Sequence, residues 1–336
     1  MDKILFLAHT EPDGSLAKPA LEVLPAALAL GGELTVALIG ASTQPAADQL
    51  AACGAVRFLA IEGAAFADSR YATDAAAAET VAKASAAAIV IAPHTPRSAR
   101  SLPGVAGRLN GTVDTHATAV SLVNGAPAVT RWFYRQRMEA VLTRTERPWF
   151  ILVECGNYAA YTRAPGSAIV ERLALPDVVT RTTVTGIHAP QADEQTIRPE
   201  AKLLFVAGAG WTKKHSDGAV HAGEAEQLIL GMLHAAQASL GGSKSLVDST
   251  GEGQAVLKCM THLNQVGQTG ATPRHPKGLA TCCHGEEPHV VGWRFINQRR
   301  AVNLDPNCGW ARGKADVVYI ADAFEVVRHV NRLLAE

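Results

Sequence analysis

The first third of the chain alternates short apolar runs with segments of helical periodicity, and this alternation constrains the fold more than any other feature of the sequence. Each apolar run has the length and composition of a strand that is buried on both faces of a parallel sheet. Between the first two runs, apolar residues recur at helical spacing, and Gly31 and Gly32 follow as a stop signal. The pattern predicts an α/β domain whose helices cover the sheet. The four runs are "KILFLA" at 3–8, "ELTVALIG" at 33–40, "VRFLAI" at 56–61 and "AAIVIAP" at 87–93.

Residues 111–156 follow a different pattern, in which alternating segments are separated by turn residues. The sequence "NGAP" at 124–127 predicts a hairpin that joins two of the strands. Farther along, residues 186–202 are polar, contain two prolines and lack periodicity, as expected of a linker. Because 336 residues exceed what one hydrophobic core usually organises, we expect two domains, residues 1–197 and 198–336.

The second half of the chain returns to an alternation of strands and helices. A predicted strand at 202–210 precedes a helix around 222–239, and strands at 300–305 and 316–322 precede a final helix. Both halves are therefore predicted to be open parallel sheets, in which ligands bind at the carboxyl ends of the strands.

The charge balance and the hydropathy of the chain indicate which classes of binding partner are improbable. Lysine plus arginine and aspartate plus glutamate each total 31, so bulk electrostatics suggest neither a nucleic acid nor a membrane surface as partner. The chain begins almost directly with an apolar strand and has no stretch that approaches a membrane span. The six cysteines include no CxxC pair, which is typical of reduced thiols. We expect a soluble, cytoplasmic protein.

Three glycine-containing polar loops lie in the second half, each after a predicted sheet element. They are "AGAGW" at 207–211, "GGSKS" at 241–245 and "QVGQTG" at 265–270. Each loop alone is better explained as an ordinary turn, because glycine serves tight connections as well as close approach to a ligand. Successive strand ends of a doubly wound sheet meet at one edge, however, so together the loops favour a site for a flat heteroaromatic ring or a phosphate.

Other polar clusters have simpler interpretations. The cysteines and histidines at 282, 283, 284, 289 and 308 match no usual zinc-ligand spacing, so the sequence indicates no metal site. Three arginines within residues 93–110 could form an anion site, but a solvated loop leading into a helix is favoured. His9 and His94 each follow an apolar strand and are interpreted as edge or capping residues rather than a catalytic pair.

Motifs along nearly the whole chain resemble one known family. The opening residues 4–40 are followed by "SLGGSKSLVDS", "NQVGQTG", "GLATCCHGEEPH" and "AVNLDPNCGWARGKADVVYIADAFEVV", in the order and spacing of the electron transfer flavoprotein alpha subunit (FixB family). This resemblance implies a Rossmann-like N-terminal α/β domain, similar to adenine nucleotide alpha hydrolases, that docks a partner. It also implies a C-terminal flavodoxin-like domain, a doubly wound parallel sheet that holds FAD.

The resemblance further implies an electron carrier without substrate turnover of its own. Such a carrier pairs with an electron transfer flavoprotein beta subunit and passes electrons from a donor dehydrogenase to an acceptor redox protein. By motif position, residues 265–269 lie against the flavin, Thr269 lies near its N5 edge and His289 lies near its C2 carbonyl. The full implied cofactor-binding set is Ser243, Lys244, Gln265, Val266, Gly267, Gln268, Thr269, His284, Gly285, Glu286, His289, Asn303 and Asp322, of which the last two hold the adenosine end.

The chain also departs from the family pattern at cofactor positions. Ala209 and Lys244 stand where the family has arginines, which removes one cation and replaces a planar guanidinium by an ammonium. Glu286 and Glu287 either oppose a reduced anionic flavin or begin a helix near Pro288, where negative charge is favourable. These departures leave an alternative open, namely a structural or regulatory subunit of a redox complex with altered or absent flavin.

Overall fold

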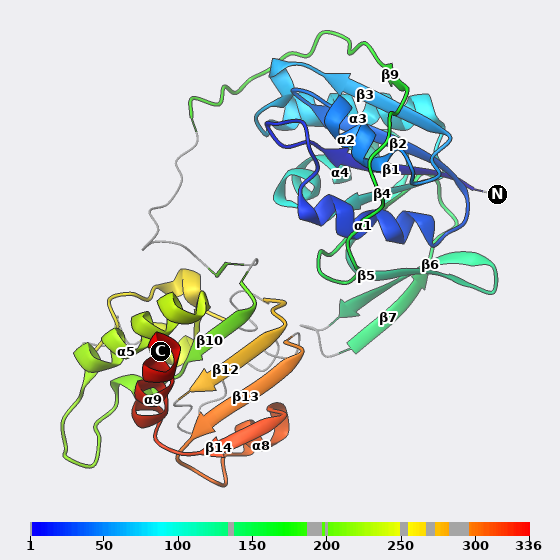
Figure 1. Cartoon of the computed structure of the whole chain (residues 1–336). Coiled ribbons are helices and arrows are strands. Elements are labelled where there is room, and N and C mark those ends of the chain that lie inside the picture. The colour runs from blue at the N-terminus through cyan, green and yellow to red at the C-terminus, as the bar shows by residue number, and fades with distance from the viewer. Residues whose placement is uncertain are drawn as a thin grey trace. The chain divides into compact units, whose positions relative to one another are not determined.

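The computed structural model describes residues 2–133, 138–186, 197–198, 201–248, 255–266, 273–281 and 296–336. The chain divides into two compact units, Met1–Ile187 and His188–Glu336, each with its own sheet (Figure 1). The predicted boundary at residue 198 falls inside the second unit. This α/β architecture with two sheets is the fold class that the sequence predicts.

The first unit is built on a nine-stranded sheet with the order β7-β6-β5-β8-β4-β1-β2-β3-β9. Its pairs are parallel except for β5–β6 and β6–β7, which form an antiparallel extension at one edge. The four apolar runs of the first third form β1 to β4, so those predictions are confirmed. The strands are β1 (Lys3–His9), β2 (Glu33–Gly40), β3 (Arg57–Glu62), β4 (Ile89–Pro93), β5 (Thr112–Val123), β6 (Ala126–Phe133), β7 (Met138–Thr143), β8 (Trp149–Val153) and β9 (Val170–Arg172).

Helices cover both faces of this first sheet. Alternate residues of β1 face opposite cores, because successive side chains of a strand point to opposite sides. Ile4 and Phe6 pack with residues of α1 and α2, whereas Leu5 and Leu7 pack with residues of α3 and α4. The sheet is therefore doubly wound. The helices are α1 (Lys18–Leu28), α2 (Gln44–Leu50), α3 (Tyr71–Ser85) and α4 (Pro96–Arg108), and a short 3-10 turn, η1 (Ala64–Phe66), precedes α3.

The predicted "NGAP" hairpin is confirmed as the connection between β5 and β6. Asn124 and Gly125 have φ values of 51° and 78°, the left-handed conformation that a tight type I′ hairpin turn requires at both central positions. Asparagine and glycine adopt this conformation at the smallest steric cost, which explains why the turn falls there.

The second unit contains a five-stranded, wholly parallel sheet with the order β11-β10-β12-β13-β14. Numbered within the unit, this is the order 2-1-3-4-5 of flavodoxin-like folds. The strands β11 and β12 were not predicted as separate strands from the sequence. The strands are β10 (Leu203–Ala207), β11 (Ser239–Gly242), β12 (Lys277–Thr281), β13 (Gln298–Asn303) and β14 (Val317–Ile320).

The helices of the second unit complete its two cores. Phe205 packs on one face of the sheet with residues of α5 and α9, and Leu204 packs on the other face with residues of α8. The helices are α5 (Ala222–Ala236), α6 (Lys244–Asp248), α8 (Gly309–Lys314) and α9 (Ala323–Ala335), with 3-10 turns η3 (Ala209–Thr212) and η5 (His262–Asn264). Within the described ranges, no helix combines the length and the apolar character that crossing a bilayer would need.

Candidate functional site

The carboxyl edge of the five-stranded sheet is the first candidate site. All five strands are parallel, so their carboxyl ends lie at the same edge. The strand order changes direction at β10, because β11 lies on one side of it and β12 on the other. Ligands of open α/β sheets bind outside the strand ends at such a switch point.

Ser243 and Lys244 follow β11 at this edge. The Ser243 N–H donates to the carbonyl of Ala207 at 2.9 Å, and its Oγ accepts a hydrogen bond from the N–H of Leu246 at 3.2 Å. Ser243 is buried and caps α6, so its described hydrogen bonds tie β10, β11 and α6 together. Lys244 is exposed, and its Nζ lies 3.7 Å from Asp248 one turn later.

Lys244 has an unfavourable position for helix stability. A cation in the first turn of a helix meets the positive end of the helix dipole, and an exposed ion pair contributes little. The ammonium of Lys244 therefore adds little to the stability of α6.

Gln265 and Val266 lie beside β11, directly after η5. The N–H of Val266 donates to the carbonyl of Gly242 at 3.0 Å, and both side chains are buried. A Cβ at Gly241 would lie 2.5 Å from Val266 Cγ2, so this close approach requires glycine in β11. The start of the "QVGQTG" motif is thus fixed against the sheet next to the carboxyl end of β11.

Asn303 and Asp322 occupy the other side of the same edge. Asn303 ends β13, is buried and accepts a hydrogen bond at Oδ1 from the N–H of Asp305 at 3.0 Å. Its carbonyl accepts from the N–H of Ala321, which precedes Asp322. Asp322 caps α9 by accepting at Oδ1 from the N–H of Glu325 at 3.1 Å. The structure therefore brings these two predicted residues to adjacent strand ends.

Seven members of the predicted set fall outside the described residues. They are Gly267, Gln268, Thr269, His284, Gly285, Glu286 and His289. In the sequence, residues 282–289 continue directly from the carboxyl end of β12, and residues 267–269 continue from Val266. Their contribution to the site stays a prediction.

Ala209 and Thr281 complete the description of the switch point. Ala209 is buried at the start of η3, where the resembling family has an arginine. Thr281 ends β12, accepts a hydrogen bond from Trp211 Nε1 at 2.9 Å and donates to the carbonyl of Val206 at 3.2 Å. Thr281 was not singled out from the sequence, and these bonds to neighbouring elements give it a structural role.

The described side chains suit a cofactor that combines a polar ring with a hydroxyl-bearing nucleotide. The exposed ammonium of Lys244 can neutralise charge on a ring or phosphate, while the amide of Asn303 and the carboxylate of Asp322 can bind hydroxyl groups and amines. These groups are chemically compatible with a flavin nucleotide and with other nucleotides.

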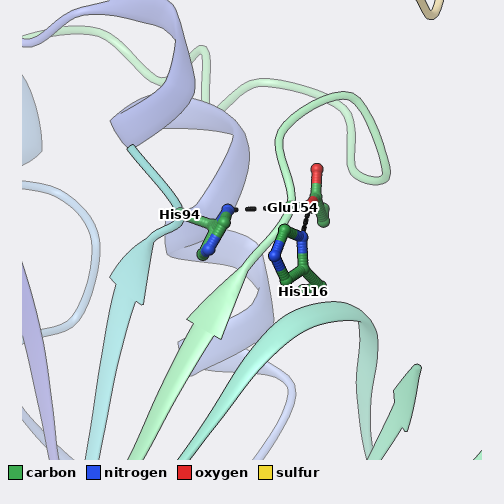
Figure 2. Close-up of side chains that lie close together, drawn as sticks. All are labelled: His94, His116 and Glu154. Atoms are coloured by element: carbon green, nitrogen blue, oxygen red, sulfur yellow. Dashed lines mark hydrogen bonds and ion pairs between the residues drawn. The ribbon is translucent and has the colours of Figure 1, made fainter. Parts of the chain in front are cut away.

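A second polar cluster lies in the first unit and was missed by the sequence analysis. Figure 2 shows His94, His116 and Glu154 converging, with both imidazoles directed at the carboxylate. His116 Nδ1 bonds Glu154 Oε1, and His94 Nδ1 lies 3.6 Å from the same oxygen. Burial lowers the pKa of His94, as do the charges of His116 and Arg131, while Glu154 acts in the opposite direction. A signal for this cluster existed in the sequence, since His94 and Glu154 each follow an apolar run directly.

A family model described as the electron transfer flavoprotein domain matches residues 4–178, which is more than half of the chain. The chain belongs to the electron transfer flavoprotein family. The chain is also similar to the electron transfer flavoprotein subunit alpha of Pseudomonas aeruginosa, at 24% identity over 324 residues that cover 95% of this chain and 96% of the relative. The resemblance found in the sequence is thereby confirmed, and the chain is a member of a flavoprotein family of electron transport. The family-model match lies within the first unit, whereas the similarity to the relative extends over both.

Proposed function

We propose that this chain is an electron transfer flavoprotein alpha subunit that binds FAD at the carboxyl edge of its second sheet. In this proposal it forms a heterodimer with a beta subunit and passes electrons from a donor dehydrogenase to an acceptor redox protein, with no substrate turnover of its own. The observation that carries the proposal is the flavodoxin-like strand order, with predicted cofactor residues at the ends of three of its strands, in a chain of this family.

The described residues have different roles in the proposed cofactor site. Ser243, Gln265 and Val266 are buried and set the backbone next to β11, so they position the loop more than they contact the ligand. Asn303 and Asp322 would hold the adenosine end. When bound, FAD supplies the redox chemistry by accepting and returning electrons through its ring.

Lys244 would supply the positive field at the ring. Its ammonium is half exposed, and its contact with Asp248 spans 3.7 Å in solvent, which an approaching anionic group can outcompete. Compared with arginine, lysine keeps the charge but loses the planar group that stacks and donates in two directions. We therefore expect Lys244 to stabilise negative charge on the reduced ring without fixing the ring's orientation.

The test is the cofactor content of the complex purified with its beta subunit. An absorption spectrum before and after a mild reductant, followed by chromatography of the released cofactor, distinguishes FAD from a shorter flavin and from none. We expect one FAD in the site of the second unit. A complex that lacks flavin absorbance, even after incubation with FAD, would falsify the proposal.

One observation favours a second candidate function. Ala209 is buried where the family has an arginine, so the end of β10 offers a cofactor no cation from that position. A subunit with altered or absent flavin would then serve as a structural or regulatory part of a redox complex. In that case the purified complex would assemble normally but contain no flavin on this chain.

A further inference from the structure

We propose that His94, His116 and Glu154 form a binding site for a divalent transition-metal ion of the zinc type in the first unit. The ligand atoms that the three residues offer all lie within 4.8 Å of one another. Two imidazoles and one carboxylate are a donor set that proteins use for zinc and for other first-row metals. This inference does not depend on the binding of a flavin by the second unit.

The three side chains come from three adjacent strands, at the level where β4 and β8 end. In the sheet, β8 lies between β4 and β5; His94 directly follows β4, Glu154 directly follows β8, and His116 lies within β5. The N–H of His94 donates to the carbonyl of Val153, and the N–H of Glu154 donates to the carbonyl of Ala117, at 2.8 Å each. These bonds tie each candidate ligand to the backbone next to another, so the sheet itself fixes their spacing (Figure 2).

A bulge in β5 directs His116 toward the other two residues. The pairing of β5 with β8 shifts register between Asp114 and Ala117, and His116 has a φ of 56° in the left-handed region. That conformation is uncommon for residues other than glycine, and bulges often re-aim a side chain at a functional position. In a regular strand, successive side chains alternate between the two faces of the sheet, and the bulge interrupts that alternation at His116.

The distances suit coordination after a small movement. With bonds of about 2.1 Å, the ligand atoms of a tetrahedral zinc site lie roughly 3.4 Å apart. His94 Nδ1 and Glu154 Oε1 are already 3.6 Å apart. The hydrogen bond between His116 and Glu154 would open to admit the ion, and the more than half exposed ring of His116 has room to move.

The surroundings hold the backbone at Glu154 and leave one side of the site open. The backbone carbonyl of Glu154 accepts a hydrogen bond from Asn157 Nδ2 at 2.8 Å, which holds the chain after β8 in place. Because His116 lies at the surface, a bound ion would keep a position for water or another exchangeable ligand. Arg131 lies near enough for its positive charge to lower the pKa of His94, and the same charge opposes a bound cation.

The experiment is a titration of the full-length chain with Zn²⁺ alone, read by calorimetry and by metal analysis after dialysis. His116→Asn removes the imidazole, and asparagine tolerates the left-handed conformation, so the fold is retained. Glu154→Gln removes the charge at constant shape. His221→Ala is the matched control, because His221 also pairs with a carboxylate, Asp217, at the surface of the second unit.

We expect the wild type and the control to bind one equivalent of Zn²⁺ that both test variants bind at least about tenfold more weakly, since even outer-shell changes cost about that much. Circular dichroism checks that each variant is folded. A wild type that binds no stoichiometric Zn²⁺, or either test variant binding it with unchanged affinity, would overturn the site.

Discussion

His9 shows how burial controls the charge of a single residue. It ends β1 with its ring buried, and burial together with the nearby charge of Arg97 lowers its pKa to about 3. Asp74 Oδ1 lies 3.8 Å from His9 Nε2, but both oxygens of Asp74 already accept hydrogen bonds from Arg97, at 2.7 and 3.0 Å. His9 is therefore neutral in the folded protein at physiological pH.

This neutral histidine makes the stability of the first unit depend on pH. The unfolded chain binds a proton at His9 below its ordinary pKa of 6.5, whereas the folded chain does not until about 3. His9 therefore lowers the free energy of unfolding as the pH falls below 6.5. Where the unfolded chain binds one full proton more than the folded chain, the decrease is about 1.4 kcal/mol per pH unit. We expect His9→Asn to flatten the free energy of unfolding between roughly pH 6 and 4, measured by denaturant titration. Parallel curves for variant and wild type would contradict this account.

Asp114 is a buried carboxylate that links β5 to Arg144, which follows β7, and to Trp149 in β8. It accepts hydrogen bonds from Arg144 Nε and Nη2 and from Trp149 Nε1, each at 2.9 Å. Burial alone would raise the pKa of Asp114, but the bonds from Arg144 and Trp149 and the charges of Arg144 and Arg131 outweigh it and lower the pKa. The carboxylate is therefore ionised throughout the neutral range.

We expect Asp114→Asn to reduce the free energy of unfolding by about 1–3 kcal/mol, the cost of leaving buried hydrogen-bonding groups without their partner. Both arginines are partly exposed and can be solvated, which keeps the loss below that of a fully buried pair. Glu171→Gln is the control, because its pair with Arg57 is exposed and contributes less than about 1 kcal/mol. Equal losses for the two variants in thermal or denaturant unfolding would contradict the assignment.

At the scale of elements, Gly241 in β11 allows Val266, at the start of the "QVGQTG" motif, to approach the sheet. Gly241→Ala places a methyl group 2.5 Å from Val266 Cγ2, and overpacking of this kind costs about 1–3 kcal/mol. We expect both a lower free energy of unfolding and a weaker retention of flavin, because Gln265 and Val266 must move. Gly223→Ala, in α5, meets no atom within 4 Å and should change stability by less than about 0.5 kcal/mol. A Gly241→Ala variant as stable as Gly223→Ala would show that the approach does not depend on glycine.

The elements that the sequence predicts are those with the strongest apolar signal. The strands β1 to β4 are buried on both faces and read as continuous apolar runs, so their prediction succeeds. The strands "SLGG" of β11 and "KGLAT" of β12 are short and rich in small residues, and their identity as strands comes from pairing with β10. The predicted ranges of β10 and α5 extend a few residues beyond the observed ends, because turns and caps decide where an element ends.

The candidate site was predictable to a different degree in each unit. Motif order alone named Asn303 and Asp322, which the structure brings to adjacent strand ends. The cluster of His94, His116 and Glu154 was not predictable from spacing, because strand order and a bulge bring together residues that are far apart in the sequence. The apolar runs before His94 and Glu154 place these two residues at strand ends, but they do not show which strands are neighbours or where β5 is irregular.

At the scale of the whole molecule, the chain combines two doubly wound units with different sites at their strand ends. The first unit carries the family-model match and the histidine–carboxylate cluster. The second carries the flavodoxin-like order and the predicted cofactor residues. In the proposed function, two arginines of the family pattern are replaced by Ala209 and Lys244. The positive charge next to the cofactor from these two positions then comes from the ammonium of Lys244 alone.

The most direct test of FAD binding at the second sheet is an equilibrium titration of the flavin-stripped complex with FAD. The wild type, Lys244→Ala and Lys277→Ala are compared, because Lys277 is an exposed lysine at the amino end of β12, the opposite edge of the same sheet. The account predicts stoichiometric binding by the wild type, unchanged affinity for Lys277→Ala, and an affinity about tenfold lower for Lys244→Ala, as expected for a lost charge-assisted contact. Absence of FAD binding by the wild type, or equal affinity of the two variants, would contradict it.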